Sequence, residues 1–176
     1  YLLSSLTNKN NFEFDINSET LEKIWSKKNA ADSHNFLWLS LIDRKNDSKI
    51  IREIIIEWIT KNNKYNSFSW ETSITCKRIL SWIFNADIIL NTASQEFKSR
   101  FIETIITQIN HLKNNLKFEK DIGKKIEILS IVYLSGLVFK KYEYNYEFAS
   151  KELQNIITYF FDTSGFPITR NSLDLI

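Results

Sequence analysis

Turn-forming residues are scarce in this sequence. The chain of 176 residues contains only three glycines and one proline. An all-β fold needs many tight turns, and glycine and proline are the residues that most often build them. Long segments without either residue favour helices, because nothing in them interrupts the backbone. The sequence therefore predicts an all-α protein.

Apolar residues recur at helical spacing in pairs of segments. Asp32 is expected to cap a helix that runs to about Asp43, and Asp47 or Ser48 to cap the next one. The second helix carries an apolar face at Ile51, Ile54, Ile55, Trp58 and Ile59. The short connection between the two helices predicts a first antiparallel hairpin.

Two more hairpins follow on the same plan. Thr72 or Ser73 opens a helix with an expected apolar stripe at Ile79, Leu80, Ile83 and Phe84. Its partner starts near Gln95 and carries Phe101, Ile105, Ile109 and Leu112. The third hairpin pairs residues 122–139 with residues 146–161. Such hairpins can stack as an open solenoid or close into an α/α toroid, and periodicity does not choose between them.

The ends of the chain suggest a fragment. Residues 1–30 are interpreted as an N-terminal extension with one possible strand at 12–16, and residues 31–176 as a single helical domain. The chain starts at Tyr1 without a methionine and stops at Ile176 within an apolar-periodic segment. The helical domain is therefore expected to continue in a longer protein.

Charge and composition exclude several classes of function. Lysine and arginine number 23 against 21 acidic residues, and a net charge of +2 gives no general attraction to nucleic acid. No apolar run reaches the roughly 20 residues that span a bilayer, so a soluble domain without membrane insertion is expected, with the choice between periplasm and cytoplasm open. A single cysteine and two histidines lack metal-ligand spacing, so no metal or cofactor is predicted.

The strongest candidate site combines Trp70, Arg78 and Trp82. Arg78 and Trp82 are four residues apart and share a helical face, and Trp70 directly precedes that helix. Indole rings can stack on the apolar face of a sugar, and a guanidinium can bind a carboxylate with two hydrogen bonds. The alternative is that Trp82 lies in the core with Arg78 packed over it.

Two further segments carry candidate residues. His34, one helical turn before Trp38, could carry a proton or could merely bond backbone groups at a helix end. Arg170 and Asn171 follow a turn that contains Gly165, and such a loop could bind an anionic ligand or could cap the next helix.

Three of these segments together resemble a known family. "SHNFLWLS" (33–40), "WETSITCKRILSWI" (70–83) and "DTSGFPITRNS" (162–172) are similar, in order and approximate spacing, to motifs of heparinase II/III-like proteins. The likeness lies in their N-terminal helical domain. It implies an incomplete α/α toroid, followed beyond Ile176 by a β-sandwich domain of the same chain.

The resemblance also implies an activity. Members of the family are polysaccharide lyases that cleave uronate-containing chains by β-elimination, so an acidic polysaccharide is the expected partner. Family lyases carry an Asn-His pair where this chain has Lys124 and Lys125, and the resemblance therefore assigns no catalytic residue here. The isolated chain is expected to be inactive. Two alternatives stay open: a non-catalytic helical-repeat interaction module and an α/α-toroid glycoside hydrolase.

Overall fold

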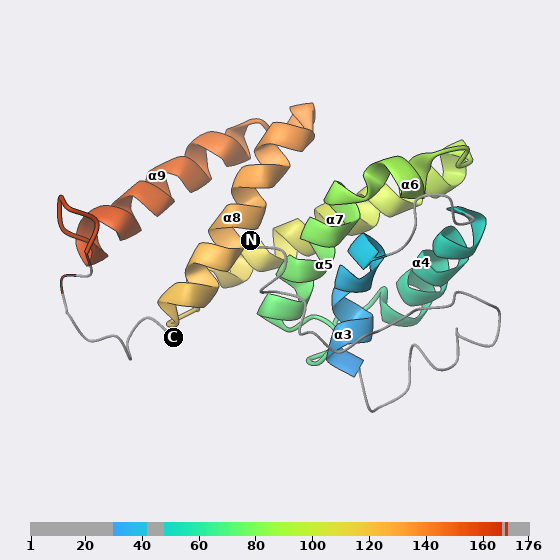
Figure 1. The fold of residues 1–176 in the computed structure, drawn as a ribbon, viewed down its shortest axis with the longest axis horizontal. Coiled ribbons are helices and arrows are strands. Elements are labelled where there is room, and N and C mark those ends of the chain that lie inside the picture. The colour runs from blue at the N-terminus through green and yellow to red at the C-terminus, as the bar shows by residue number, and fades with distance from the viewer. Residues whose placement is uncertain (1–29, 42–47, 167, 169–176) are drawn as a thin grey trace. The chain divides into compact units, whose positions relative to one another are not determined.

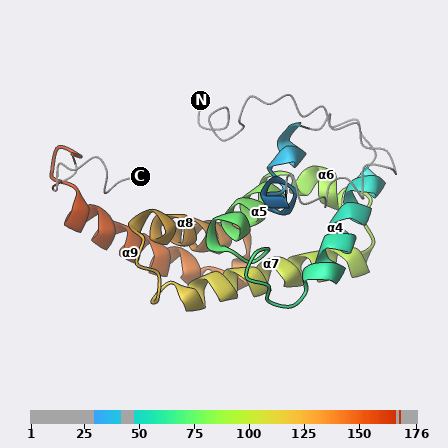
Figure 2. The ribbon, with the colours of Figure 1, turned by 90° about the horizontal axis from the view of Figure 1, so that it is seen from below.

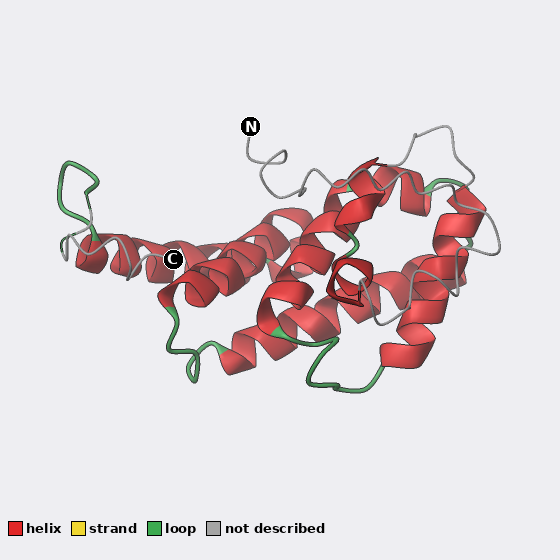
Figure 3. Cartoon of the chain, turned by 60° about the horizontal axis from the view of Figure 1, so that its bottom comes forward, coloured by secondary structure: helices red, strands yellow, loops and turns green. Residues whose placement is uncertain are grey.

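The structure, a computed structural model, describes residues 30–41, 48–166 and 168. Every regular element within these residues is a helix, so the all-α prediction is confirmed (Figure 3). The possible strand at 12–16 lies outside the described residues. The elements in chain order are α3 (Ala30–Asn35), η2 (Leu37–Leu41), α4 (Ser48–Asn62), α5 (Thr72–Phe84), α6 (Ala86–Leu90), α7 (Gln95–Asn115), α8 (Ile122–Val138), η3 (Lys140–Tyr142) and α9 (Tyr144–Phe160).

The chain forms two compact units, 1–104 and 105–176, with the boundary inside α7. In the first unit α3 packs on α5, and α4 packs on the short helix α6. The sequence pattern did not predict α6. The predicted apolar face of α4 is confirmed, because all five of its residues are buried. The predicted start of α7 at Gln95 is confirmed as well, and Phe101, Ile105, Ile109 and Leu112 are buried.

The first helix is much shorter than predicted. It ends at Asn35, and Asp32 lies within its first turn instead of capping it. Phe36 then adopts a left-handed conformation with a φ of 58°, and the side-chain oxygen of Asn35 accepts the N–H of Leu37 at 2.9 Å. Such a φ is unfavourable for a bulky residue. Complete burial of the Phe36 ring offsets this cost. The packing of Phe36, a tertiary contact, therefore ends the helix.

Helix α5 begins where predicted but buries a different face. The side chain of Glu71 accepts the N–H of Ile74 at 3.0 Å and caps the helix. The predicted stripe at Ile79, Leu80, Ile83 and Phe84 is wrong, because only Ile79 is buried and Phe84 is 60% exposed. The buried face instead includes Thr75, Arg78, Ser81 and Trp82. Polar side chains occupy this core face, so an apolar criterion could not find it.

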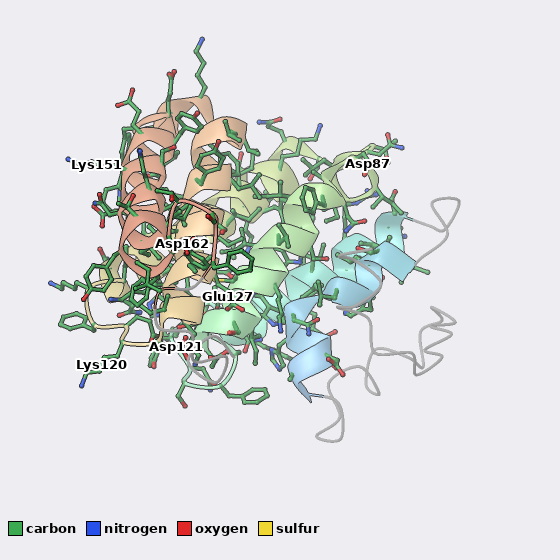
Figure 4. All side chains as sticks on the ribbon, turned by 60° about the vertical axis from the view of Figure 1, so that its left-hand side comes forward. Asp87, Lys120, Asp121, Glu127, Lys151 and Asp162 are labelled. Carbon is green, nitrogen blue, oxygen red and sulfur yellow. The ribbon has the colours of Figure 1, made fainter. Side chains whose placement is uncertain are left out.

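In the second unit α8 and α9 form the predicted third hairpin, and they lie side by side in both Figure 1 and Figure 2. Asp121 caps α8 by accepting the N–H of Lys124 at 3.0 Å (Figure 4). A Cβ atom at Gly136 would lie 2.3 Å from the backbone nitrogen of Tyr146. The glycine therefore allows the two helices to approach closely.

Candidate functional site

Arg78 lies at the centre of a buried cluster in the first unit. Its Nη1 donates to the carbonyl oxygens of His34 and Ser69, each at 2.9 Å, and its Nη2 donates to Thr75 Oγ1 at 3.1 Å. The guanidinium carbon lies 4.1 Å from the ring centroid of Trp58. Arg78 thus joins α3, α4, α5 and the loop before α5.

The charge of Arg78 is stabilised largely by dipoles and by an aromatic face. Burial lowers the pKa of Arg78 to about 9, and the nearby Cys76 opposes this shift. The guanidinium remains protonated at neutral pH. Carbonyl oxygens and the π face of Trp58 both attract a desolvated cation. The arrangement suits a positioning role, because the donors already point at the protein backbone.

Aromatic rings pack around this arginine. The rings of Trp58 and Trp82 have centroids 5.5 Å apart and meet edge to face. Phe36 lies 5.2 Å from Trp82 and 6.2 Å from Trp58, also edge to face, and Trp38 stacks on Phe36 at 5.5 Å. Such geometries add favourable contact energy to the burial of the rings. We call Arg78, Trp58, Trp82, Phe36 and His34 the Arg78 cluster.

His34 is a half-buried, neutral member of the Arg78 cluster. Trp58 Nε1 donates to His34 Nδ1 at 2.9 Å, so Nδ1 is unprotonated and the ring proton is on Nε2. Burial and, to a lesser extent, Arg78 lower the pKa of His34 to about 4. His34 is therefore neither a cation nor a ready proton donor at neutral pH.

The structure brings five of the seven predicted site residues into one region. Arg78 and Trp82 have no exposed surface, whereas Trp38 and Trp70 are 5% and 6% exposed. Trp70 Nε1 donates to the carbonyl oxygen of Asn62 at 3.0 Å, which attaches the loop to the end of α4. Burial of Trp82 and Arg78 agrees with the packing alternative, but the ring that Arg78 covers is that of Trp58 instead of Trp82. Ligand binding by His34, Trp38, Trp70, Arg78 and Trp82 stays a prediction.

The other two predicted residues, Arg170 and Asn171, lie outside the described residues. The turn that precedes them is described, and Asp162 organises it. Asp162 Oδ1 accepts the N–H of Ser164 at 2.8 Å and of Phe166 at 2.9 Å, and Gly165 has a φ of 81°. A left-handed glycine and an aspartate that bonds the backbone are typical of a tight turn.

Two exposed aromatic residues beside the cluster were missed by the sequence analysis. Tyr65 and Phe68 lie in the loop between α4 and α5 and are 66% and 46% exposed. The Phe68 ring lies 5.6 Å from that of His34, and Tyr65 lies 6.5 Å from Trp70. Closely spaced aromatic residues in the polar stretch "KYNSFSW" were the available signal. We call Tyr65, Phe68 and His34 the aromatic rim.

The described residues offer few other groups that could bind a metal ion or react chemically. They contain no group of three histidine, cysteine or acidic side chains that could bind a metal ion. None of the described helices is both long enough and apolar enough to cross a bilayer. Cys76 is a buried free thiol. The Arg78 cluster and the aromatic rim are therefore the arrangement to explain in the first unit.

No protein-family model, curated protein or solved structure matches the chain. Its own residues, with the motif resemblance, are the basis for a functional proposal.

Proposed function

We propose that this chain is the helical part of a heparinase II/III-like polysaccharide lyase and binds an acidic, uronate-containing polysaccharide for β-elimination. One observation carries the proposal: two of the three segments that resemble the family, 33–40 and 70–83, pack together. Arg78 bonds the carbonyl of His34, and Ser81 Oγ donates to the carbonyl of Phe36 at 2.6 Å. A chance likeness of short, separate segments gives no reason for such contacts.

The proposal includes an incomplete α/α toroid as the arrangement of the helices. The predominance of helices in the described residues and the α8–α9 hairpin support it. Such an arrangement forms from successive hairpins, with ligands bound in clefts lined by aromatic residues.

Buried and exposed residues have different roles in this proposal. Arg78, Trp82, Trp38 and Trp70 position the loop and α3, because their side chains are buried. Sugar contact in the first unit is assigned to the aromatic rim, where Phe68 and Tyr65 offer exposed ring faces that a pyranose can cover. The fixed tautomer of His34 places an N–H on Nε2, a neutral donor suited to hydroxyl or carboxylate oxygens.

The proposed reaction needs three contributions. A donor neutralises the uronate carboxylate, a base removes the C5 proton, and an acid protonates the departing O4. The C4–O4 bond breaks and a C4–C5 double bond forms, without water. A neutral His34 can help to polarise a carboxylate, but its low pKa makes it a poor acid at neutral pH. The base and the acid are not assigned to described residues.

The product of β-elimination provides the test. The full-length protein that contains this chain is incubated with polygalacturonate, alginate and heparan-type polymers, and absorbance of the 4,5-unsaturated product is followed. Increasing absorbance with one polymer is expected. A flat signal on every uronate polymer, from protein whose circular dichroism shows folded helices, would refute the lyase proposal.

Variants of the aromatic rim test the assigned contact. Phe68→Ala should weaken binding of the polymer by about fivefold, because stacking on one ring is worth on the order of 1 kcal/mol. Phe84→Ala is the matched control, since Phe84 is also an exposed phenylalanine, 60% accessible, at the end of α5 and away from the aromatic rim. Equal effects of the two variants would remove the aromatic rim from the proposal.

A further inference from the structure

The second unit has a groove bordered by three segments of the chain. Its volume is about 590 Å³, and residues from the end of α7, from α8 and from α9 line it. Lys113 at the end of α7 and Lys117 in the turn after it line one side of the groove. Lys125 and Leu129 on α8 are four residues apart, as are Phe148 and Glu152 on α9. Residues at this spacing share one side of a helix, so α8 and α9 each present one face to the same space.

The walls of the groove combine apolar surface with positive charge. Leu129 is only 1% exposed and Phe148 is 36% exposed, so a buried aliphatic group and an accessible ring both border the space. Three lysines line it, with Glu152 as the one acidic residue among the lining residues. The groove therefore has a local excess of positive charge that the near-neutral composition of the chain conceals.

The lysine ammonium groups are not neutralised within the described part of the chain. No carboxylate there lies within ion-pair distance of Lys113, Lys117 or Lys125. Lys113 Nζ instead donates to Asn145 Oδ1 at 2.9 Å and lies 4.8 Å from the Phe148 ring centroid. Lys113 is thus held by Asn145 beside an aromatic ring. Lys117 Nζ lies 4.8 Å from the Phe118 ring centroid, and its N–H groups and those of Lys125 can offer donors to a ligand.

We propose that this groove is a binding site for an anionic oligosaccharide, with its carboxylate or sulfate at Lys117 and Lys125 and a sugar ring against Phe148. The inference rests on the proposed function, because it assigns a second contact region for the same class of ligand. Ammonium groups attract either anion, and a pyranose ring has an apolar face that can cover an aromatic ring. Neutral sugars lack the first interaction, and inorganic anions lack the second.

Titration calorimetry on the full-length protein tests the groove. The probes are tetragalacturonate, which carries carboxylates, and a heparin-derived tetrasaccharide, which also carries sulfates; maltotetraose and inorganic sulfate are the controls. The double variant Lys117→Ala/Lys125→Ala should bind the preferred anionic probe about tenfold more weakly. Glu152→Gln should bind it about twofold to threefold more tightly, because a repulsive charge is removed.

A matched control separates the groove from general electrostatics. Lys151 is an exposed lysine on α9 that does not line the groove (Figure 4), and Lys151→Ala should leave affinity unchanged. Circular dichroism establishes that each variant is folded. The inference is overturned if neither anionic probe binds, if inorganic sulfate binds as tightly as the probes, or if the double variant and Lys151→Ala behave alike.

The outcomes also separate this inference from the lyase proposal. Unsaturated product from a uronate polymer, with binding that does not depend on Lys117 and Lys125, would overturn the groove and leave the lyase. Lysine-dependent binding without product from any uronate polymer would support the groove and remove the lyase.

Discussion

The guanidinium of Arg78 lies 4.1 Å from the ring centroid of Trp58, and both side chains are completely buried. A cation and an indole from two helices are thus stacked in the interior of the first unit. The arginine also bonds the carbonyl oxygens of His34 and Ser69, so one side chain connects segments that are far apart in the sequence. The stability of this unit should depend strongly on that contact.

Arg78→Lys should destabilise the first unit by about 1–3 kcal/mol. A lysine keeps the charge but lacks the planar fork, so at least one buried carbonyl oxygen loses its donor. Urea unfolding followed by tryptophan fluorescence measures the change. Arg100→Lys is the control, because Arg100 is exposed and bonds only the exposed Thr60, at 3.1 Å. Similar midpoints for both variants would contradict the central role of Arg78.

Trp58→Phe should cost about 1–3 kcal/mol more than Trp82→Phe. Both substitutions remove the same indole volume from fully buried positions. Trp58 Nε1 donates to His34, whereas Trp82 Nε1 has no hydrogen-bond partner among the described residues. Trp58→Phe therefore also loses a buried hydrogen bond, whereas Trp82→Phe loses none that the described residues make. The difference in free energy of unfolding between the two variants is the measurement, and a difference of zero would argue against the His34–Trp58 bond.

Stability should decrease as the pH falls from about 6.5 toward 4. The pKa of His34 is lowered from 6.5 to about 4 in the folded protein, chiefly by burial and secondarily by Arg78. The unfolded chain therefore binds a proton at His34 more readily than the folded chain does. The contribution of neutral His34 to folding stability is fully present only above the ordinary pKa of 6.5. Protonation of Nδ1 would also remove the acceptor for Trp58.

His34→Asn provides the comparison for this pH dependence. Its amide oxygen can still accept the N–H of Trp58, but it does not titrate. Urea midpoints measured across this pH range should fall more steeply for the natural chain than for the variant, while His111 titrates in both. Parallel curves would show that His34 does not couple protonation to folding.

Gly136→Ala should destabilise the α8–α9 hairpin by about 1–3 kcal/mol, because overpacking forces the backbones apart. The added Cβ would lie 2.3 Å from the backbone nitrogen of Tyr146, an atom that cannot rotate away. At Gly123 the nearest atom would be a side-chain oxygen of Asp121 at 3.1 Å, so Gly123→Ala is the milder control. Hydrogen exchange of α9 amides measures the local effect, and equal exchange in the two variants would contradict the close-contact argument.

The candidate site was only partly predictable. Sequence spacing placed Arg78 and Trp82 on one helical face, and both are buried on α5, because residues one helical turn apart share a face. It could not show that Arg78 is buried, because polar residues are ordinarily expected at the surface. Tyr65 and Phe68 were missed because no periodic pattern marks a loop residue that is exposed beside a buried cluster.

Most of the helices follow from the sequence alone, although α6 and the early end of α3 do not. The apolar faces of α4 and α7 and the α8–α9 hairpin follow from local spacing, and local spacing is sufficient because helical hydrogen bonds join residues four apart. The end of α3 and the buried face of α5 depend on tertiary contacts. Those features depend on the Phe36 ring among Trp58 and Trp82, and on Arg78 bonding His34 across 44 residues. The free energy of such contacts appears only after distant segments have met, so no local pattern can encode it.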